Sequence, residues 1–203
     1  MFWLVLVIAL LIGVLIGLLL ARLRRPQPPP PPPPPPPPQC PPPKIPDNFD
    51  PPTLSSTISV RLAGTPANGA AAAAPVANQV IWVDAGDEVL VHLDSVQTRI
   101  LDRVVLISID LESDQSGRTP LIVSFALGSA TDPAGLVAVT DEYPRGDGSL
   151  AARWGEAVQA ALWSTLLGIA EEHAIERGKA PAGIVAAPGV LTLYTGDPIG
   201  AGP

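Results

Sequence analysis

The chain has 203 residues, 27 of them proline, a formal net charge of −7 and a single cysteine, Cys40. One cysteine excludes an intramolecular disulfide and any metal site built from several cysteines of one chain. Beyond Pro52 there are eight Lys or Arg against seventeen Asp or Glu, a net of about nine negative charges. This balance argues against nucleic acid as a partner, because its phosphates would be repelled.

An apolar N-terminal segment runs from Phe2 to Ala21 without a single charge. At 1.5 Å per residue a helix of this length measures about 30 Å, the thickness of the hydrocarbon core of a bilayer. The segment lacks both a basic start and a small-residue cleavage site, which a signal peptide would have. We therefore expect an uncleaved transmembrane helix and assign residues 1–25 to this helix and its basic flank.

Three arginines, Arg22, Arg24 and Arg25, follow the apolar segment, and no basic residue precedes it. Cytoplasmic flanks of membrane helices carry the excess of Lys and Arg. The arginines therefore predict a single-pass protein of the cell membrane, with the lipid bilayer as a partner and the following domain in the cytoplasm. The opposite topology stays open, because many anchored domains on Pro-rich spacers face outward; it would give an extracytoplasmic sensing or envelope domain.

Two glycines in the apolar segment, Gly13 and Gly17, have the small-xxx-small spacing that lets transmembrane helices approach closely. This spacing suggests a homodimer through helix-helix contact. The same spacing is common by chance in apolar segments. Generic glycines of a membrane span are therefore the alternative.

Residues 26–52 contain eighteen of the 27 prolines. Consecutive prolines lack amide hydrogens and have a fixed φ, so they form an extended left-handed helix. At about 3.1 Å per residue the segment reaches up to roughly 80 Å. We interpret it as a spacer, with Cys40 as a spectator thiol. A docking track for a proline-binding groove is the alternative.

The remaining residues, 53–203, are enough for one globular domain with a real core. In its first part, Thr57–Leu62 alternates like a strand, and 63–78 is a low-complexity Ala/Gly/Pro loop or second linker. Further β-rich runs separated by turn residues predict strands. These runs are Gln79–Asp84, Glu88–Asp94 with a possible continuation to Leu101, Arg103–Glu112, Pro120–Leu127 and Gly135–Thr140.

One long helix is predicted from Leu150 to Arg177, where apolar residues recur at intervals of three and four before Gly178. A last pair of strands follows at Gly183–Ala187 and Val190–Thr195. Because strands precede the helix and do not alternate with it, the sequence predicts an α+β fold. We expect a mainly antiparallel sheet packed by one long C-terminal helix.

Two of the predicted strands, Leu121–Leu127 and Leu136–Val139, are apolar on both faces. Strands of this kind are usually covered on both sides. We therefore expect both to be central in the sheet, with the helix on one face and a second layer or a second copy of the protein on the other.

Polar side chains share faces on two predicted strands, because side chains alternate with a period of two. If the strands are neighbours, a histidine, a serine and carboxylates could converge and support acid/base or metal-assisted chemistry. The alternative is the solvent face of a half-buried sheet. The residues are His92 and Asp94 on one strand and Ser108, Asp110 and Glu112 on the other.

Other chemical motifs are weak. His173 lies near the end of the predicted helix, where a partly cationic imidazole would suit the helix C-terminus, but its spacing is not that of a zinc helix. The acidic loop 141–148 lacks the ligand spacing of a calcium loop. The sequence has no P-loop, dinucleotide fingerprint, nucleophile elbow or kinase signature, so we expect neither a cofactor nor a metal ion.

These features favour a non-enzymatic membrane-anchored protein. In this hypothesis a rigid spacer presents a compact acidic domain to a protein partner, and the protein acts as an adaptor, tether or assembly component. The alternative is a membrane-tethered hydrolase or metal-dependent enzyme that uses the polar strand face around His92 and Asp110. Ten arginines against two lysines, with abundant Ala, Gly and Pro, indicate a GC-rich bacterial genome.

Overall fold

The structure is a computed structural model that describes residues 45–64, 71–72, 78–129, 135–136 and 142–198. The predicted transmembrane helix with Gly13 and Gly17, its arginine flank, Cys40 and most of the spacer lie outside the described residues. So does most of the strand predicted at Gly135–Thr140. Within the described ranges, no helix is both long enough and apolar enough to cross a membrane.

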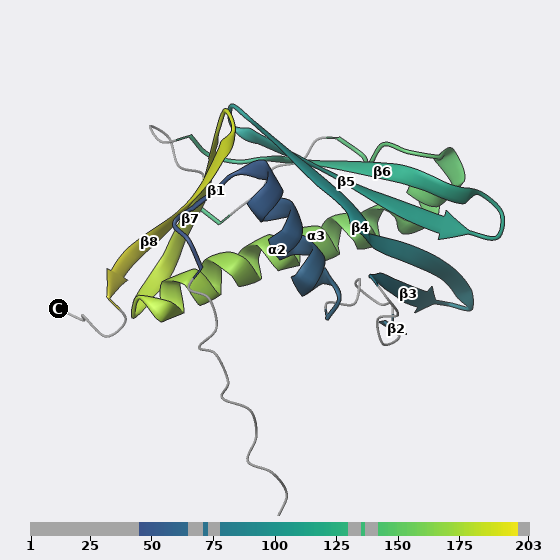
Figure 1. Cartoon of the computed structure of the whole chain (residues 1–203), viewed down its shortest axis with the longest axis horizontal. Helices are drawn as coiled ribbons and strands as arrows, with labels where there is room; N and C mark the ends of the chain where they lie inside the picture. The colour runs from purple at the N-terminus through teal and green to yellow at the C-terminus, as the bar shows by residue number, and fades with distance from the viewer. Residues whose placement is uncertain (1–44, 65–70, 73–77, 130–134, 137–141, 199–203) are drawn as a thin grey trace, which may run out of the picture. The chain divides into compact units, whose positions relative to one another are not determined.

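The described residues form an α+β fold with two antiparallel sheets and a long C-terminal helix, as the order of the elements predicted (Figure 1). One sheet has the strand order β2-β3-β4-β5-β6 and the other has the order β1-β8-β7. The strands are β1 Asn48–Phe49, β2 Ala71–Ala72, β3 Gln79–Asp84, β4 Asp87–Leu101, β5 Val104–Ser113, β6 Gly117–Ala126, β7 Lys179–Ala187 and β8 Val190–Pro198, and the helices are α2 Pro51–Leu62 and α3 Gly148–Glu176.

The prediction of a strand at Thr57–Leu62 is wrong, because these residues belong to helix α2. Asp50 caps the helix: its carboxylate accepts a hydrogen bond from the backbone N–H of Thr53 at 2.9 Å. Pro51 and Pro52 fill the first helical positions, where a missing N–H costs nothing. The Asp-Pro-Pro sequence was the local signal for this helix.

The apolar side chains of α2 recur every four residues and face the core. The alternation that suggested a strand included Val60, but this side chain is 77% exposed. Helix α2 packs against β4 and α3, and Figure 1 shows α2 and α3 side by side. The buried residues of α2 are Leu54, Ile58 and Leu62.

The folded part of the chain takes in the end of the range predicted to be spacer. Strand β1 and the first two residues of α2 both lie within 26–52. Strand β1 pairs with β8, and Phe49 is buried opposite Leu191. The described chain therefore joins the domain before residue 53.

The strands of the large sheet follow the predicted runs closely. β3 has the predicted bounds, and β4 includes the continuation to Leu101. The β3–β4 hairpin turns at Ala85 and Gly86, which both have positive φ values of 51° and 91°. Positive φ at both central positions matches the right-handed twist of the strands. β4 has a bulge between His92 and Gln97.

Strand β6 corrects the prediction that Leu121–Leu127 forms a central strand. In the described part of the chain, β6 is the last strand of its sheet. Its pattern is one-sided, because Ile122 is 40% exposed between buried neighbours. Its outer edge meets Arg145 in a single antiparallel bridge. The other run predicted to be central, Leu136–Val139, lies outside the described residues apart from Leu136, which is in a turn.

Helix α3 covers the core and confirms the predicted long helix. It begins at the N-cap Asp147, whose carboxylate accepts hydrogen bonds from the backbone N–H groups of Ser149 and Leu150 at 3.0 and 3.3 Å. Its buried side chains and those of α2 and β3–β6 form one hydrophobic cluster. The buried apolar stripe of α3 consists mainly of Trp154, Val158, Ala161, Leu162, Leu166 and Ile169. The strand pair predicted after the helix is also confirmed, as β7 and β8.

Candidate functional site

The pairing of β4 with β5 brings the candidate residues of both strands to one face of the large sheet. His92 lies opposite Asp110, and Glu112 lies opposite Leu90. The Nε2 atom of His92 is 2.7 Å from an Oε atom of Glu112. Ser108 shares this face of β5 with Asp110 and Glu112, as predicted, but it lies opposite Gln97, beyond the bulge in β4. On the opposite face of β5, the apolar side chains belong to the core, as the two-residue period predicted.

His92 is a buried histidine on this polar face, with 3% exposure. The side-chain amide nitrogen of Gln79 lies 3.3 Å from its Nδ1 atom. A carboxylate oxygen accepts, so Nε2 of the imidazole is the donor in the contact with Glu112. The buried imidazole therefore orients the carboxylate of Glu112.

Arg118 on β6 holds the other carboxylates of the face. Its Nε atom donates to an Oδ atom of Asp110 at 2.8 Å, and its guanidinium lies 3.9 Å from Asp94. The hydrogen bond to Asp110 is the main cause of a raised pKa of Arg118. Arg118 was not among the predicted site residues; the turn after Ser113 could have revealed it, since the hairpin register places Arg118 opposite Glu112.

Ser95 fixes the backbone at the bulge beside His92. Its hydroxyl donates to the carbonyl oxygen of His92 at 2.6 Å and accepts from the backbone N–H of Asp110 at 2.7 Å. The hydroxyl therefore replaces a ladder hydrogen bond where the register shifts. The polar face is rigidly positioned at this point.

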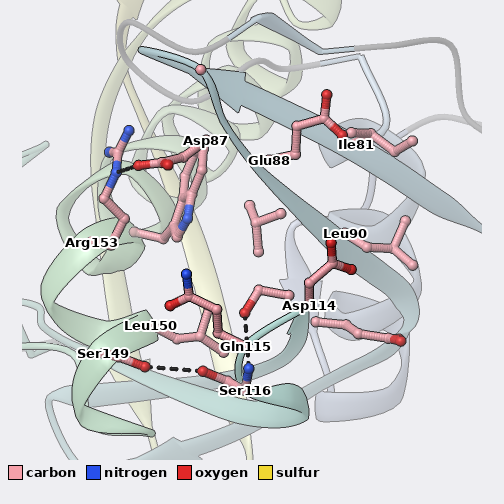
Figure 2. A pocket seen from close by; sticks show the side chains of 15 residues that line it. Ile81, Asp87, Glu88, Leu90, Asp114, Gln115, Ser116, Ser149, Leu150 and Arg153 are labelled. Carbon is pink, nitrogen blue, oxygen red and sulfur yellow. Dashed lines mark hydrogen bonds and ion pairs between the residues drawn. The ribbon is translucent and has the colours of Figure 1, made fainter.

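A cleft of about 690 Å³ lies next to this face, at one end of the large sheet (Figure 2). The β3–β4 turn, the β5–β6 turn and the first turns of α3 surround it. Glu112 belongs to both the polar face and the cleft wall. The apolar lining residues are Ile81, Val89, Leu90, Leu150 and Trp154, and the charged ones are Asp87, Glu88, Glu112, Asp114 and Arg153.

Arg153 is the cation of the cleft lining, and its charge is already matched. Its guanidinium lies 2.9 Å from Asp84 and 2.7 Å from Asp87, and it also donates to the carbonyl oxygen of Asp84 at 2.6 Å. The hydrogen bond to Asp87 is the main cause of a raised pKa of Arg153. The guanidinium also stacks over Trp154, 4.7 Å from the ring centroid. Arg153 therefore ties α3 to the β3–β4 turn.

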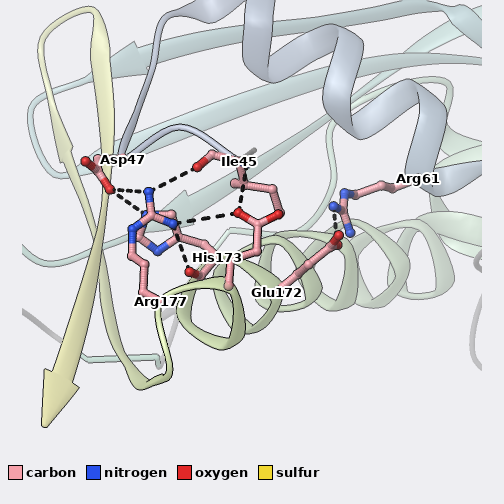
Figure 3. Close-up of polar contacts among 7 residues, drawn as sticks. Ile45, Asp47, Arg61, Glu172, His173 and Arg177 are labelled. Carbon is pink, nitrogen blue, oxygen red and sulfur yellow. Dashed lines mark hydrogen bonds and ion pairs between the residues drawn. The ribbon is translucent and has the colours of Figure 1, made fainter. Parts of the chain in front are cut away.

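A second polar group, which we term the junction cluster, lies where the described chain begins (Figure 3). His173 is almost fully buried, and its Nε2 atom lies 2.8 Å from Oδ1 of Asp47. Arg177 donates to the same oxygen at 2.7 Å and to the carbonyl oxygen of Ile45 at 3.2 Å. The cluster is completed by Glu176, whose carboxylate accepts from the backbone N–H of Ile45 at 3.1 Å.

The electrostatics of the junction cluster favour a charged Asp47. The hydrogen bond with His173, followed by the positive charge of Arg177, lowers the pKa of Asp47. The sequence analysis placed His173 at the end of the helix but gave it no partner. That partner lies 126 positions earlier in the chain, and no local pattern indicates such a pair.

Among the described residues, no group of three or more His, Cys, Asp or Glu side chains is arranged to hold a metal ion. Comparison of the chain with protein-family models, with curated proteins and with solved structures found no match. The polar face, the cleft and the junction cluster are therefore the features on which a function can be argued.

Proposed function

We propose that the protein is a non-enzymatic, membrane-anchored adaptor in which the Pro-rich spacer presents the α+β domain to a protein partner. The junction cluster is the observation that carries this proposal. It fastens the residues next to the proline run to the C-terminal end of α3. Force transmitted through a spacer acts first on the residues where the folded domain begins. A domain held on a spacer therefore needs these residues to be firmly attached.

The attachment combines several kinds of contact. Phe49 is 1% exposed and Ile45 is 7% exposed, so both side chains are part of the core. Strand β1 adds backbone pairing with β8, and Thr192 donates a side-chain hydrogen bond to Asn48 at 2.8 Å. Burial of two large apolar side chains contributes roughly 1.5 to 3 kcal/mol each. Residues 45–49 are thus packed and hydrogen-bonded as part of the fold.

The membrane part of the proposal rests on the sequence. The apolar run Phe2–Ala21 supplies the anchor, and the arginines after it favour a cytoplasmic domain. Self-association through Gly13 and Gly17 would double the number of presented domains. A reporter that is active only outside the cytoplasm, fused after residue 203, tests the topology: low activity is expected, and high activity would place the domain outside.

Proximity labelling tests the adaptor function. The full-length protein is compared with a variant that lacks residues 28–38 and with a variant in which Gly and Ser replace these prolines at equal length. The deletion shortens the reach by about 34 Å, so we expect it to lose most of the neighbours of the full-length protein. The flexible replacement should lose fewer. Identical neighbour sets for all three folded, membrane-bound proteins would contradict the proposal.

A catalytic role of the polar strand face is the second candidate. The observation that favours it is the hydrogen bond between buried His92 and Glu112, which lies beside the cleft. In such a pair the carboxylate orients the imidazole for acid/base chemistry. The double variant His92→Gln, Asp110→Asn tests it. If this variant is folded and supports full cellular function, the enzyme hypothesis fails.

A further inference from the structure

We propose that the cleft between the β3–β4 turn, the β5–β6 turn and α3 binds a short basic peptide segment of the partner, in which Arg or Lys alternates with aliphatic side chains. The proposal rests on the adaptor function and names the chemistry of its partner. The size of the cleft fits this role. Pockets for small ligands usually have volumes of about 300 to 1,000 Å³, and this cleft has a volume of about 690 Å³.

The cleft has an apolar floor that is open to a ligand. Ile81 is 38% exposed, and Leu90 beside it is half-buried. Figure 2 shows both side chains along one wall, with Leu150 on the opposite side. Leu150 and Trp154 are almost fully buried, so the accessible apolar area of the cleft belongs mainly to Ile81 and Leu90. Aliphatic side chains of a peptide would remove Ile81 and Leu90 from water, which favours binding.

The rim of the cleft carries unmatched negative charge. Asp87 shares the guanidinium of Arg153 with Asp84, so its charge is largely matched. Among the described residues, no hydrogen bond or ion pair is made by the side-chain carboxylate of Glu88 or of Asp114, and Figure 2 shows both side chains at the cleft. These two carboxylates attract cations and repel anionic ligands, in line with the acidic character of the whole domain.

Glu112 supplies a third carboxylate, and here the structure shows a prepared position and not merely an acidic surface. Buried His92 holds one carboxylate oxygen at 2.7 Å. The side chain of Glu112 is still 43% exposed, so its other oxygen can accept from a guanidinium or ammonium group. A side chain that is already oriented loses little entropy on binding. Glu112 would thus be the anchoring acceptor, with Glu88 and Asp114 as flanking acceptors.

The spacing of the charges favours a peptide over a single small cation. The three carboxylates come from three separate segments, namely the start of β4, the end of β5 and the turn after it. They do not form a cluster able to hold a metal ion among the described residues. Separated carboxylates around apolar side chains match cationic groups that are separated by aliphatic ones. An extended segment with alternating side chains has this pattern.

The experiment measures binding of a labelled hexapeptide of alternating leucine and arginine to the full-length protein in detergent micelles, by fluorescence anisotropy. A hexapeptide of alternating leucine and glutamate is the probe control. The variant Glu88→Gln, Asp114→Asn removes the two flanking charges. The matched control Asp102→Asn, Glu171→Gln removes two exposed charges outside the cleft. Circular dichroism and thermal unfolding establish that all variants are folded.

We expect the cleft variant to weaken binding of the arginine peptide by about five- to twentyfold, and the matched control by less than about twofold. Ile81→Ser should also weaken it, because the floor loses apolar area. Equal weakening by the cleft variant and the matched control would overturn the proposal in favour of general charge attraction. Displacement of the peptide by spermidine at equal concentration would also overturn it, since a small polyamine would then suffice.

The binding test and the labelling test fail independently. If the arginine peptide binds in the cleft but the neighbour sets do not depend on the spacer, the adaptor function fails and the site stands. If the neighbour sets depend on the spacer but the peptide does not bind at millimolar concentration, the adaptor stands and the basic-peptide site is refuted.

Discussion

His173 and Asp47 are hydrogen-bonded at 2.8 Å although 126 positions separate them in the chain. The pair joins the first described residues of the domain to the C-terminal end of helix α3. Arg177 donates to the same carboxylate oxygen, and its guanidinium also reaches the carbonyl oxygen of His173 at 2.9 Å. The attachment of residues 45–47 to the end of α3 is therefore a network, and its members can be tested separately.

Replacement of His173 should loosen the start of the domain. His173→Ala removes a buried hydrogen-bond donor and leaves a space, so we expect a loss of about 1 to 3 kcal/mol in the free energy of unfolding, measured with urea. Hydrogen exchange at residues 45–49 should accelerate more than in β5. His173→Gln keeps an N–H donor at a similar reach and should lose less. Unchanged exchange at 45–49 in His173→Ala would contradict the role of the junction cluster.

Acid should destabilise the protein partly through Asp147. The hydroxyl of Ser149, followed by the backbone N–H groups of Leu150 and Ser149, lowers the pKa of Asp147 below its usual value of 3.8. Because the folded pKa is the lower one, the stabilisation is fully present above about pH 4. It is lost as the pH falls through the folded pKa.

Asp147→Asn isolates this contribution, since Asn also caps helices well but cannot titrate. We expect the variant to have similar stability at pH 7 and a shallower loss of stability between pH 5 and pH 2, measured by thermal unfolding. Asp50, which caps α2, has a lowered pKa for a similar reason, led by its hydrogen bond with Thr53. A variant with the acid slope of the original protein would show that Asp147 is not responsible.

Two glycines should respond to alanine in opposite directions. Gly168 lies inside α3, and a Cβ atom there would meet nothing within 4 Å. Gly168→Ala should therefore raise the free energy of unfolding by roughly 0.5 to 1 kcal/mol, as expected from helix propensity. At Gly146 a Cβ atom would lie 2.8 Å from the backbone oxygen of Pro120. Gly146→Ala should lower the free energy by roughly 1 to 3 kcal/mol.

The same denaturant experiment checks both glycine variants. Equal effects, or a stabilising Gly146→Ala, would mean that the loop before α3 does not approach β6 as closely as 2.8 Å. The bridge between Ile122 and Arg145, with N–O distances of 2.7 and 2.8 Å, holds this loop against β6. That bridge leaves little room for the loop to move away.

Replacement of Leu162 should be among the most destabilising changes in the core. Its side chain is completely buried on the stripe of α3, so Leu162→Ala should lower the free energy of unfolding by about 2 to 5 kcal/mol. Ile175 lies on the same helix but is 67% exposed. Ile175→Ala should change the free energy by less than about 0.5 kcal/mol. Similar losses in both variants would contradict the orientation of α3.

Local sequence patterns predicted most of the elements. The strands β3 to β5 and the β7–β8 pair could be predicted because period-two apolar patterns and turn residues are local properties. The helix α3 could be predicted for the same reason, from its three-and-four spacing. Helix α2 was missed because Ile58, Val60 and Leu62 alternate as in a strand, and the stronger Asp50-Pro-Pro capping signal was not used.

The edge position of β6 shows a different limit. The composition of Leu121–Leu127 is apolar, but a strand's place in a sheet depends on which neighbours pair with it. The chain after β6 leaves this sheet, since Gly128 bridges in parallel to Val185 of β7. In the described part of the chain, the outer edge of β6 at Ile122 therefore pairs with Arg145 and not with another strand.

The sequence by itself determined the order and type of most elements, the α+β class, and the polar faces that carry His92 and Asp110, because each depends on spacing within one segment. Only the tertiary structure decided which carboxylates are matched by distant segments. The packing of α3 brings Arg153 to Asp87 and His173 to Asp47, whereas the Arg118–Asp110 pair lies within one hairpin and follows from its register. Charge matching is a property of distances between segments, and these distances exist only after the segments have packed.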